Sequence, residues 1–250
     1  MQLIQEDIFV CLDIEATGLD PKKDRIIEIA AAKFTFTETL TTFHHLINPN
    51  TSIPIESQKI HHITDEMVAN QPFIEEILPS LLEFLGDYPL VGHGLTFDIE
   101  IIQEAAKQCS ISDPLKNNKI IDTLRLARLY GESPSNSLEV LRAHFNIPFE
   151  GAHRAANDVV VNIKVFKHLA KKFKTTQELL KRLEKPISMR TMPLGKHKGR
   201  FFKEIPLEYL LWAAKQSFDQ DLLYSIRLEI NKRKSVRNFS QAGNPFHNLT

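Results

Sequence analysis

Two acidic residues, Asp13 and Glu15, lie two positions apart in a short segment that is otherwise apolar. In a strand, residues i and i+2 point to the same face, so these carboxylates would lie side by side. Neighbouring carboxylates in an apolar element repel each other and lose hydration, and a bound cation removes that penalty. Oxygen ligands favour Mg²⁺ or Mn²⁺ over zinc. The pair therefore indicates a divalent-metal site; the alternative is that one carboxylate only caps the next turn.

Three further residues with suitable chemistry lie far along the chain. Asp98 follows the apolar residues 90–91 and two glycines and begins an apolar helix, where an acid could equally serve only the helix dipole. Asp158 falls in the first turns of a long helical segment, and His153 lies just before that segment. Histidine titrates near neutrality and suits a general base, although a histidine at such a loop position could equally be a surface residue.

The segments around these residues alternate between strand and helix patterns. Apolar runs with β-branched residues predict strands at residues 8–14, 25–36, 40–47, 89–93 and 119–122. Helical spacing of apolar residues predicts helices at residues 55–63, 64–69, 74–85, 97–107, from 123, 137–144 and 155–173. Three antiparallel strands followed by two β–α units predict an α/β fold, with a mixed five-stranded sheet flanked by helices.

The composition is that of an ordinary globular protein, with 42% hydrophobic and 25% charged residues in a chain of 250. No apolar stretch reaches the roughly 20 residues that span a bilayer. Residues 1–7 lack the basic-then-apolar pattern of a secretory signal. Cys11 and Cys109 have apolar neighbours and no metal-ligand spacing, which is typical of core residues in a reducing compartment. We therefore expect a cytoplasmic protein.

The zero net charge conceals a division along the chain. Residues 1–170 carry 14 Lys and Arg against 24 Asp and Glu, and residues 171–250 carry 17 against 7. A basic part suggests contact with nucleic acid, although basic tails are often only solvated. We expect domains at 1–174 and 192–237, joined by a linker at 175–191 and followed by a disordered tail at 238–250.

The expected second domain is small, basic and mainly helical. It begins with a basic turn at residues 192–200 that contains two glycines. Such a Gly-Lys-x-Lys-Gly turn can bring backbone N–H groups and ammonium charges near phosphate, so Lys196, Lys198 and Arg200 are candidate phosphate contacts. The alternative is a solvated turn beside a small helical bundle with Trp212 in its core.

Taken together, these segments resemble the DnaQ-like exonucleases of the DEDDh group. That family is defined by D-x-E followed by T-G, by a second acid in G-H-x-x-x-F-D, and by H-x-x-x-x-D. The corresponding segments are residues 13–19 (DIEATGL), 92–98 (GHGLTFD) and 153–158 (HRAAND). Residues 61–67 (HHITDEM) match a segment that these enzymes often carry between the first two blocks. The resemblance covers about residues 7–172 and implies an RNase H-like fold.

The resemblance also implies a mechanism. Four acids, Asp13, Glu15, Asp98 and Asp158, would hold two divalent ions about 4 Å apart, one activating water and the other stabilising the leaving oxygen. His153 would act as the general base, and a tyrosine in its place would mark the sister group. The reaction would be hydrolysis of the terminal phosphodiester bond at a 3′ end.

By the same resemblance, Thr17, Gly18 and Leu19 would meet the terminal nucleotide, with Leu19 wedged against its base. His93 and Phe97 would line the groove for the penultimate base, where an aromatic face suits an unpaired strand.

Two positions, each directly after a histidine of the family motifs, leave questions open. Arg154 would face a phosphate or would only begin a helix at the surface. Many relatives carry Asn directly after the histidine of the second block, whereas this chain has Gly94. The departure puts a polar contact beside the second acid, and so the substrate preference, in doubt.

The sequence leaves three functions to separate. The first is a DNA exonuclease for single-stranded or frayed 3′ ends, in DNA repair or as an epsilon-type proofreading subunit bound to the alpha subunit of DNA polymerase III. An RNA-processing exonuclease is the alternative, because relatives with the same active site degrade RNA ends. The third is a non-catalytic binding subunit. Residues 192–199 (MPLGKHKG), 205–206 and 209–212 (YLLW) resemble the small domain that ends exodeoxyribonuclease X-type proteins, which favours a self-sufficient nuclease.

Overall fold

The computed structural model describes residues 2–112, 114–133, 135–148 and 154–242, with side chains up to residue 235. The chain forms two compact units, Met1–Leu183 and Glu184–Thr250. The predicted base, His153, lies outside the described residues.

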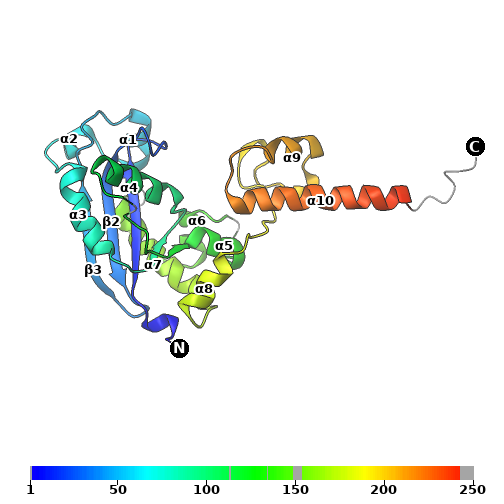
Figure 1. Cartoon of the computed structure of the whole chain (residues 1–250), viewed down its shortest axis with the longest axis horizontal. Helices are drawn as coiled ribbons and strands as arrows, with labels where there is room; N and C mark the ends of the chain where they lie inside the picture. Colours follow the sequence, from blue (N-terminus) through cyan, green and yellow to red (C-terminus); the bar gives the residue numbers. More distant parts are fainter. Residues whose placement is uncertain (1, 113, 134, 149–153, 243–250) are drawn as a thin grey trace, which may run out of the picture. The chain divides into compact units, whose positions relative to one another are not determined.

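The first unit is built on the mixed five-stranded sheet that the sequence predicted (Figure 1). Its strands are β1 (Phe9–Ala16), β2 (Ile26–Phe34), β3 (Thr39–Leu46), β4 (Leu90–Gly92) and β5 (Ile120–Asp122), in the order β3-β2-β1-β4-β5. Strand β2 pairs antiparallel with both β1 and β3. Strand β4 pairs in parallel with β1 on one side and with β5 on the other. The apolar strand β1 is therefore central, whereas β3, whose threonines are exposed, forms an edge.

Helices cover both faces of this sheet. They are α1 (Ile55–His61), α2 (Asp65–Val68), α3 (Ile74–Leu85), α4 (Thr96–Gln108), α5 (Thr123–Tyr130), α6 (Leu138–His144), α7 (Ala155–Ala170) and α8 (Thr176–Leu183). On one face, Val10, Leu12 and Ile14 of β1 pack with α3 and α4 in a single apolar cluster. The helix α7 lies on the other face, where the thiol of Cys11 donates to the Val159 carbonyl of that helix at 3.7 Å.

The helix α8 falls within the segment expected to be a linker. Leu179 and Leu183 are buried one turn apart on this helix, and Glu178, Lys181 and Arg182 are its charged residues. Two apolar anchors suffice to dock a short helix on the first unit, but they are too few to stand out in the sequence. The last helix, α10 (Gln220–Ala242), extends into the expected disordered tail, and residues 243–250 lie outside the described residues.

The second unit has a small core of its own. It comprises α9 (Leu207–Ala213), α10 and two 3₁₀ helices, Gly195–His197 and Phe202–Glu204. Its buried apolar residues are Met192, Phe202, Ile205, Leu210, Ala213, Leu222, Ile226 and Ile230. Trp212, the alternative core residue, is 52% exposed instead. In α9 it is Leu210 and Ala213, three positions apart, that face the core.

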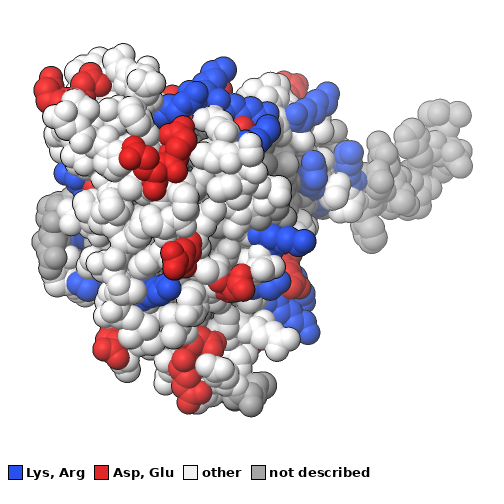
Figure 2. Space-filling view, turned by 60° about the vertical axis from the view of Figure 1, so that its left-hand side comes forward, with Lys and Arg blue, Asp and Glu red and all other residues white. Residues whose placement is uncertain are grey.

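The division of charge follows these units. Glu184–Thr250 carries 12 Lys and Arg against 6 Asp and Glu, which leaves 19 against 25 for Met1–Leu183. On the face shown in Figure 2, basic and acidic side chains are interspersed.

Both cysteines are free thiols. Cys11 is buried, as expected, and Cys109 packs half-buried against the cluster under α3 and α4. Among the described residues, no helix is both long and apolar enough to cross a membrane.

Candidate active site

The two acids of β1 point towards α7. Asp13 and Glu15 alternate with Leu12 and Ile14 and therefore share the face of Cys11, which contacts α7. Asp158 lies in the first turn of that helix. The candidate ligand oxygens of Asp13, Glu15 and Asp158 all lie within 4.8 Å of one another. Three of the four predicted metal ligands, from distant parts of the chain, thus lie close together.

The fourth acid, Asp98, enters from α4 and is buried. Strands β1 and β4 run parallel, so their carboxyl ends share one edge of the sheet, and α4 begins just after β4. After burial, the negative charge of Asp98 is the largest influence that raises the pKa of Asp13. All four predicted acids therefore belong to one electrostatic cluster.

Burial and mutual repulsion raise the pKa values of three of these carboxyl groups. Burial, followed by repulsion from Asp98 and Glu15, raises the pKa of Asp13 well above its usual value. Burial, followed by repulsion from Asp158, raises the pKa of Glu15 to about 7. Burial also raises the pKa of Asp98 to about 7, with repulsion from Glu15 adding to it. A divalent cation would offset this repulsion, and a donor set of carboxylate oxygens fits Mg²⁺ or Mn²⁺.

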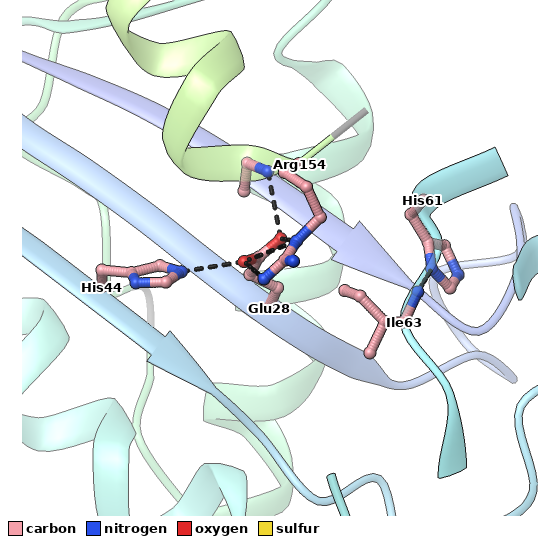
Figure 3. A network of polar contacts seen from close by, with 6 residues as sticks. Glu28, His44, His61, Ile63 and Arg154 are labelled. Atoms are coloured by element: carbon pink, nitrogen blue, oxygen red, sulfur yellow. Dashed lines mark hydrogen bonds and ion pairs between the residues drawn. The ribbon is translucent and has the colours of Figure 1, made fainter. Parts of the chain in front are cut away.

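A buried acid that the sequence analysis missed, Glu28, anchors the start of α7 (Figure 3). Arg154 donates from Nη2 to Oε1 at 2.7 Å and from Nε to Oε2 at 3.1 Å. The Ala155 amide donates to Oε2 at 3.0 Å, and Nε2 of His44 lies 2.8 Å from Oε1. Burial alone would raise the pKa of Glu28, but these hydrogen bonds outweigh it and lower the pKa below its usual value.

This anchor is connected to the acidic cluster. Glu28 lies directly opposite Glu15 in the β1–β2 register, so the two side chains share a face. The charge of Arg154 lowers the pKa of Glu15 against the other influences on it. Arg154 was a candidate phosphate contact, but its guanidinium is engaged by Glu28. A lone acid inside the apolar run of β2 was the signal that could have identified Glu28.

The loop after β1 holds the residues expected to meet the terminal nucleotide. The Thr17 hydroxyl donates to Oδ1 of Asp24 at 2.9 Å and accepts from the Arg25 amide at 3.0 Å. A Cβ atom on Gly18 would lie 2.6 Å from the Asp24 carboxylate, so the loop needs glycine there. Leu19, in contrast, is 90% exposed. A fixed loop thus carries one protruding apolar side chain.

The residues expected beside the penultimate base are more enclosed. Nδ1 of His93 lies 3.0 Å from the Thr123 hydroxyl, and its Nε2 lies 2.8 Å from the Asn136 carbonyl. Both ring nitrogens are therefore engaged within the protein, and burial lowers the pKa of His93. Phe97 is partly buried against the cluster under α3 and α4.

Gly94, the departure from the family pattern, is explained by its backbone. Its φ of +79° lies in the left-handed region, which glycine adopts without strain. Its amide donates to Oδ1 of Asp122 at 2.9 Å, and the same oxygen accepts from the Leu124 amide at 2.8 Å. Asp122, a second residue that the sequence analysis missed, thus ties the loop before Asp98 to the start of α5.

A family model described as an exonuclease, RNase_T, matches residues 10–166. The chain belongs to this exonuclease family. A second family model, described as a putative quorum-sensing-regulated virulence factor, matches residues 177–227 of the exonuclease. The resemblance of the second unit to the end of exodeoxyribonuclease X-type proteins stays a prediction.

Named relatives agree with the first match. The exonuclease is 35% identical over 159 residues to "DNA polymerase III subunit epsilon" of Aquifex aeolicus, covering 63% of this chain and 78% of that one. It is 32% identical over 222 residues to "DNA polymerase III PolC-type" of Clostridium perfringens, covering 88% of this chain. The chain spans only 15% of the length of that PolC-type relative.

Solved structures share the fold. "Exonuclease X in complex with 5' overhanging duplex DNA" superposes with a TM-score of 0.56 and 23% identity, covering 71% of this chain and 99% of that one. The exonuclease I of Methylocaldum szegediense gives a TM-score of 0.59 and 22% identity, covering 71% of this chain and 43% of that one. The predicted RNase H-like exonuclease fold is confirmed.

Proposed function

We propose that this exonuclease removes nucleotides from the 3′ ends of DNA by metal-dependent hydrolysis, with a preference for single-stranded or frayed ends. The observation that carries the proposal is the meeting of Asp13, Glu15 and Asp158 within 4.8 Å, on the face of the sheet that α7 covers. Buried Asp98 completes a cluster whose mutual repulsion calls for cations.

In this proposal each residue has a definite part. Asp13, Glu15, Asp98 and Asp158 would hold two divalent cations, Mg²⁺ or Mn²⁺, which supply positive charge at the scissile phosphate and its attacking and leaving oxygens. An imidazole nitrogen of His153 would accept the proton of the attacking water.

The chain around these residues would keep them in place. The ion pair of Glu28 with Arg154 fixes the residue that directly follows His153 and the turn that carries Asp158. Positioning of this kind would hold the described neighbours of the proposed base in place, and a two-metal hydrolysis requires such positioning.

The substrate end would be bound by the loop after β1. Leu19 would wedge against the terminal base, while Thr17 and Gly18 present the backbone of the loop to the terminal nucleotide. The ring faces of Phe97 and His93 would meet the next base. Apolar and ring contacts of this kind need an unpaired base, which is the reason to expect single-stranded or frayed ends.

DNA is the preferred substrate in this proposal because two relatives of the chain are named as parts of DNA polymerases. Association with a polymerase alpha subunit is proposed on the same ground. An exoribonuclease is the alternative, and it would need a contact to the ribose 2′-hydroxyl.

Digestion of 5′-labelled strands would test the reaction and its direction. In Mg²⁺ we expect a ladder of shortened, still-labelled products from DNA, slower digestion of the matched RNA strand, and none in EDTA. Asp13→Ala should abolish the ladder, whereas Glu38→Ala, which removes an exposed acid from the β2–β3 turn, should leave it unchanged. Release of the labelled 5′ nucleotide first, or equal activity of the Asp13 variant, would overturn the proposal. Faster digestion of RNA would favour the exoribonuclease.

A further inference from the structure

The single tryptophan of the chain lies on the surface of the second unit. Trp212 is 52% exposed on α9, and its neighbour Leu211 is 41% exposed. The core beneath is already filled by Leu210 and Ala213. An aromatic side chain this large usually contributes to a core or to an interface, and two adjacent exposed apolar side chains make this position a candidate interface.

Trp212 is packed against the basic turn through a second ring. The rings of Tyr209 and Trp212 have centroids 5.2 Å apart, and those of Tyr209 and His197 have centroids 4.5 Å apart. The Tyr209 hydroxyl lies 3.1 Å from the point that a Cβ atom on Gly195 would occupy. The buried His197 ring and the half-buried Tyr209 ring therefore connect exposed Trp212 to the turn.

The turn itself has a fixed shape. Gly195 and Gly199 adopt φ values of +72° and +82°, which close it at both ends. The Lys198 amide donates to the Gly195 carbonyl at 3.1 Å, and the Gly199 amide donates to the Met192 carbonyl at 2.8 Å. The ammonium groups of exposed Lys196 and Lys198 thus extend from a rigid base on either side of buried His197.

Positive charge dominates the sequence around this surface. Residues 191–216 carry five basic residues against two acidic ones: Lys196, Lys198, Arg200, Lys203 and Lys215 against Glu204 and Glu208. The charge is complementary to a phosphate backbone, and the exposed ring is complementary to an unpaired base. Duplex DNA would offer only the first, because its base faces are stacked.

We propose that Lys196, Lys198, Tyr209 and Trp212, here called the aromatic–basic patch, bind single-stranded DNA. A base stacks on Trp212, and backbone phosphates lie against Lys196 and Lys198. Arg200, whose Nη1 lies 3.4 Å from Nδ1 of His197, adds charge beside them. The inference deepens the proposed function, since it gives the second unit the task of holding the strand that the first unit trims.

The emission of Trp212 reports on this contact directly, because the chain contains no other tryptophan. The full chain is titrated in EDTA, so that no digestion occurs, with an oligothymidylate of about 16 nucleotides, which is the upper range for one single-strand binding module. We expect quenching of the emission that weakens as salt is added. Binding of a labelled oligonucleotide without any change in Trp212 emission would overturn the proposal.

Variants separate the stacking contact from the charges. Trp212→Ala should weaken binding of the labelled strand about tenfold, and Trp212→Phe should retain most of the affinity. Lys196→Ala with Lys198→Ala should flatten the slope of log affinity against log salt by about 1.4, at about 0.7 for each phosphate contact. The charge-matched control is Lys232→Ala with Lys234→Ala on exposed positions of α10. Equal flattening by both pairs would overturn the patch, and thermal melting by circular dichroism verifies that each variant is folded.

The patch and the exonuclease proposal fail in different ways. Asp13→Ala should lose digestion and keep the quenching. Quenching in a wild-type protein that digests no strand would overturn the exonuclease proposal alone. Digestion of DNA by a protein whose Trp212 emission never responds would overturn the patch alone. Binding of a protein partner in place of the strand would appear as this second outcome.

Discussion

Arg154 and Glu28 form a two-pronged ion pair between the start of α7 and the first half of β2, with the shortest contact, Nη2 to Oε1, at 2.7 Å. The Glu28 side chain has no exposed surface, and its other oxygen accepts from the Ala155 amide. The Glu28 carboxylate thus accepts hydrogen bonds both from the Arg154 side chain and from a backbone amide at the start of α7. Its partner Arg154 directly follows the proposed base.

Glu28→Gln should destabilise the protein and slow the reaction together. The substitution leaves the Arg154 charge without its partner in a partly buried position, so we expect the free energy of unfolding to fall by about 2–3 kcal/mol. The turnover number should fall more than the Michaelis constant changes, because α7 loses its anchor. Urea denaturation and steady-state kinetics measure the two effects. Glu38→Gln is the exposed control, and a Glu28 variant as stable as this control would contradict the role of the ion pair.

The acidic cluster predicts a pH dependence of the metal-free protein. Glu15 and Asp98 have pKa values raised to about 7 in the folded state, above their unfolded values of about 4. Between these pH values the folded protein binds more protons than the unfolded chain, so the free energy of unfolding falls as pH rises from about 4.5 to 7. Calorimetric Tm values in EDTA measure this slope, and Asp13→Asn should reduce it.

Mg²⁺ should restore the stability that is lost at high pH. Protons compete with the cation for the same oxygens, so the rise in Tm on adding Mg²⁺ should be larger at about pH 8 than at about pH 5.5. An equal rise at both pH values would show that the cation acts elsewhere.

Gly94 should be replaceable only at a cost in stability. Alanine is strained at a φ of +79°, so Gly94→Ala should lower the free energy of unfolding by about 1–2 kcal/mol. Asn tolerates this region better, and Gly94→Asn, which restores the residue of many relatives, should cost less. Urea denaturation of both variants tests the order, and equal losses would argue against backbone strain as the cause.

Leu19 offers a substitution that affects substrate alone. It is 90% exposed, so Leu19→Ala should change the free energy of unfolding by less than about 0.5 kcal/mol. If its side chain wedges against the terminal base, kcat/KM on DNA should fall about tenfold, because burying a leucine side chain contributes about 1.5–3 kcal/mol. Leu40→Ala at an exposed position of β3 is the control. Unchanged kcat/KM in the Leu19 variant would remove this side chain from the substrate site.

Local spacing singled out Asp13 and Glu15, whereas Asp98 and Asp158 were assigned by the family resemblance. Alternation in β1 places Asp13 and Glu15 on one face, and the sheet order follows from hairpin and β–α patterns. Glu28 lies 126 residues from its partner Arg154, and the local sequence around either residue does not predict the ion pair. The hydrogen bond of Gly94 to Asp122 likewise depends on the pairing of β4 with β5.

The second unit shows a different limit of sequence reasoning. Leu210, Leu211 and Trp212 are consecutive large apolar residues, and apolar content alone does not say which of them faces inward. Leu210 is the one that faces inward, because it packs with the apolar residues of α10 in the core. Exposure of Trp212 therefore follows from the packing of two helices and not from its residue type.

The central place of β1 in the sheet determines how this exonuclease would lose activity. Val10 and Cys11 pair with β2 on one side and with β4 on the other, so the β1 amides should be among the slowest in the protein to exchange with deuterium. Asp13 and Glu15 follow directly on this doubly paired segment and are themselves paired with β2, so they should be released only when the sheet itself opens. In rising urea, catalysis that depends on them should persist until the whole unit unfolds, while small losses of rate before that point would arise at the start of α7.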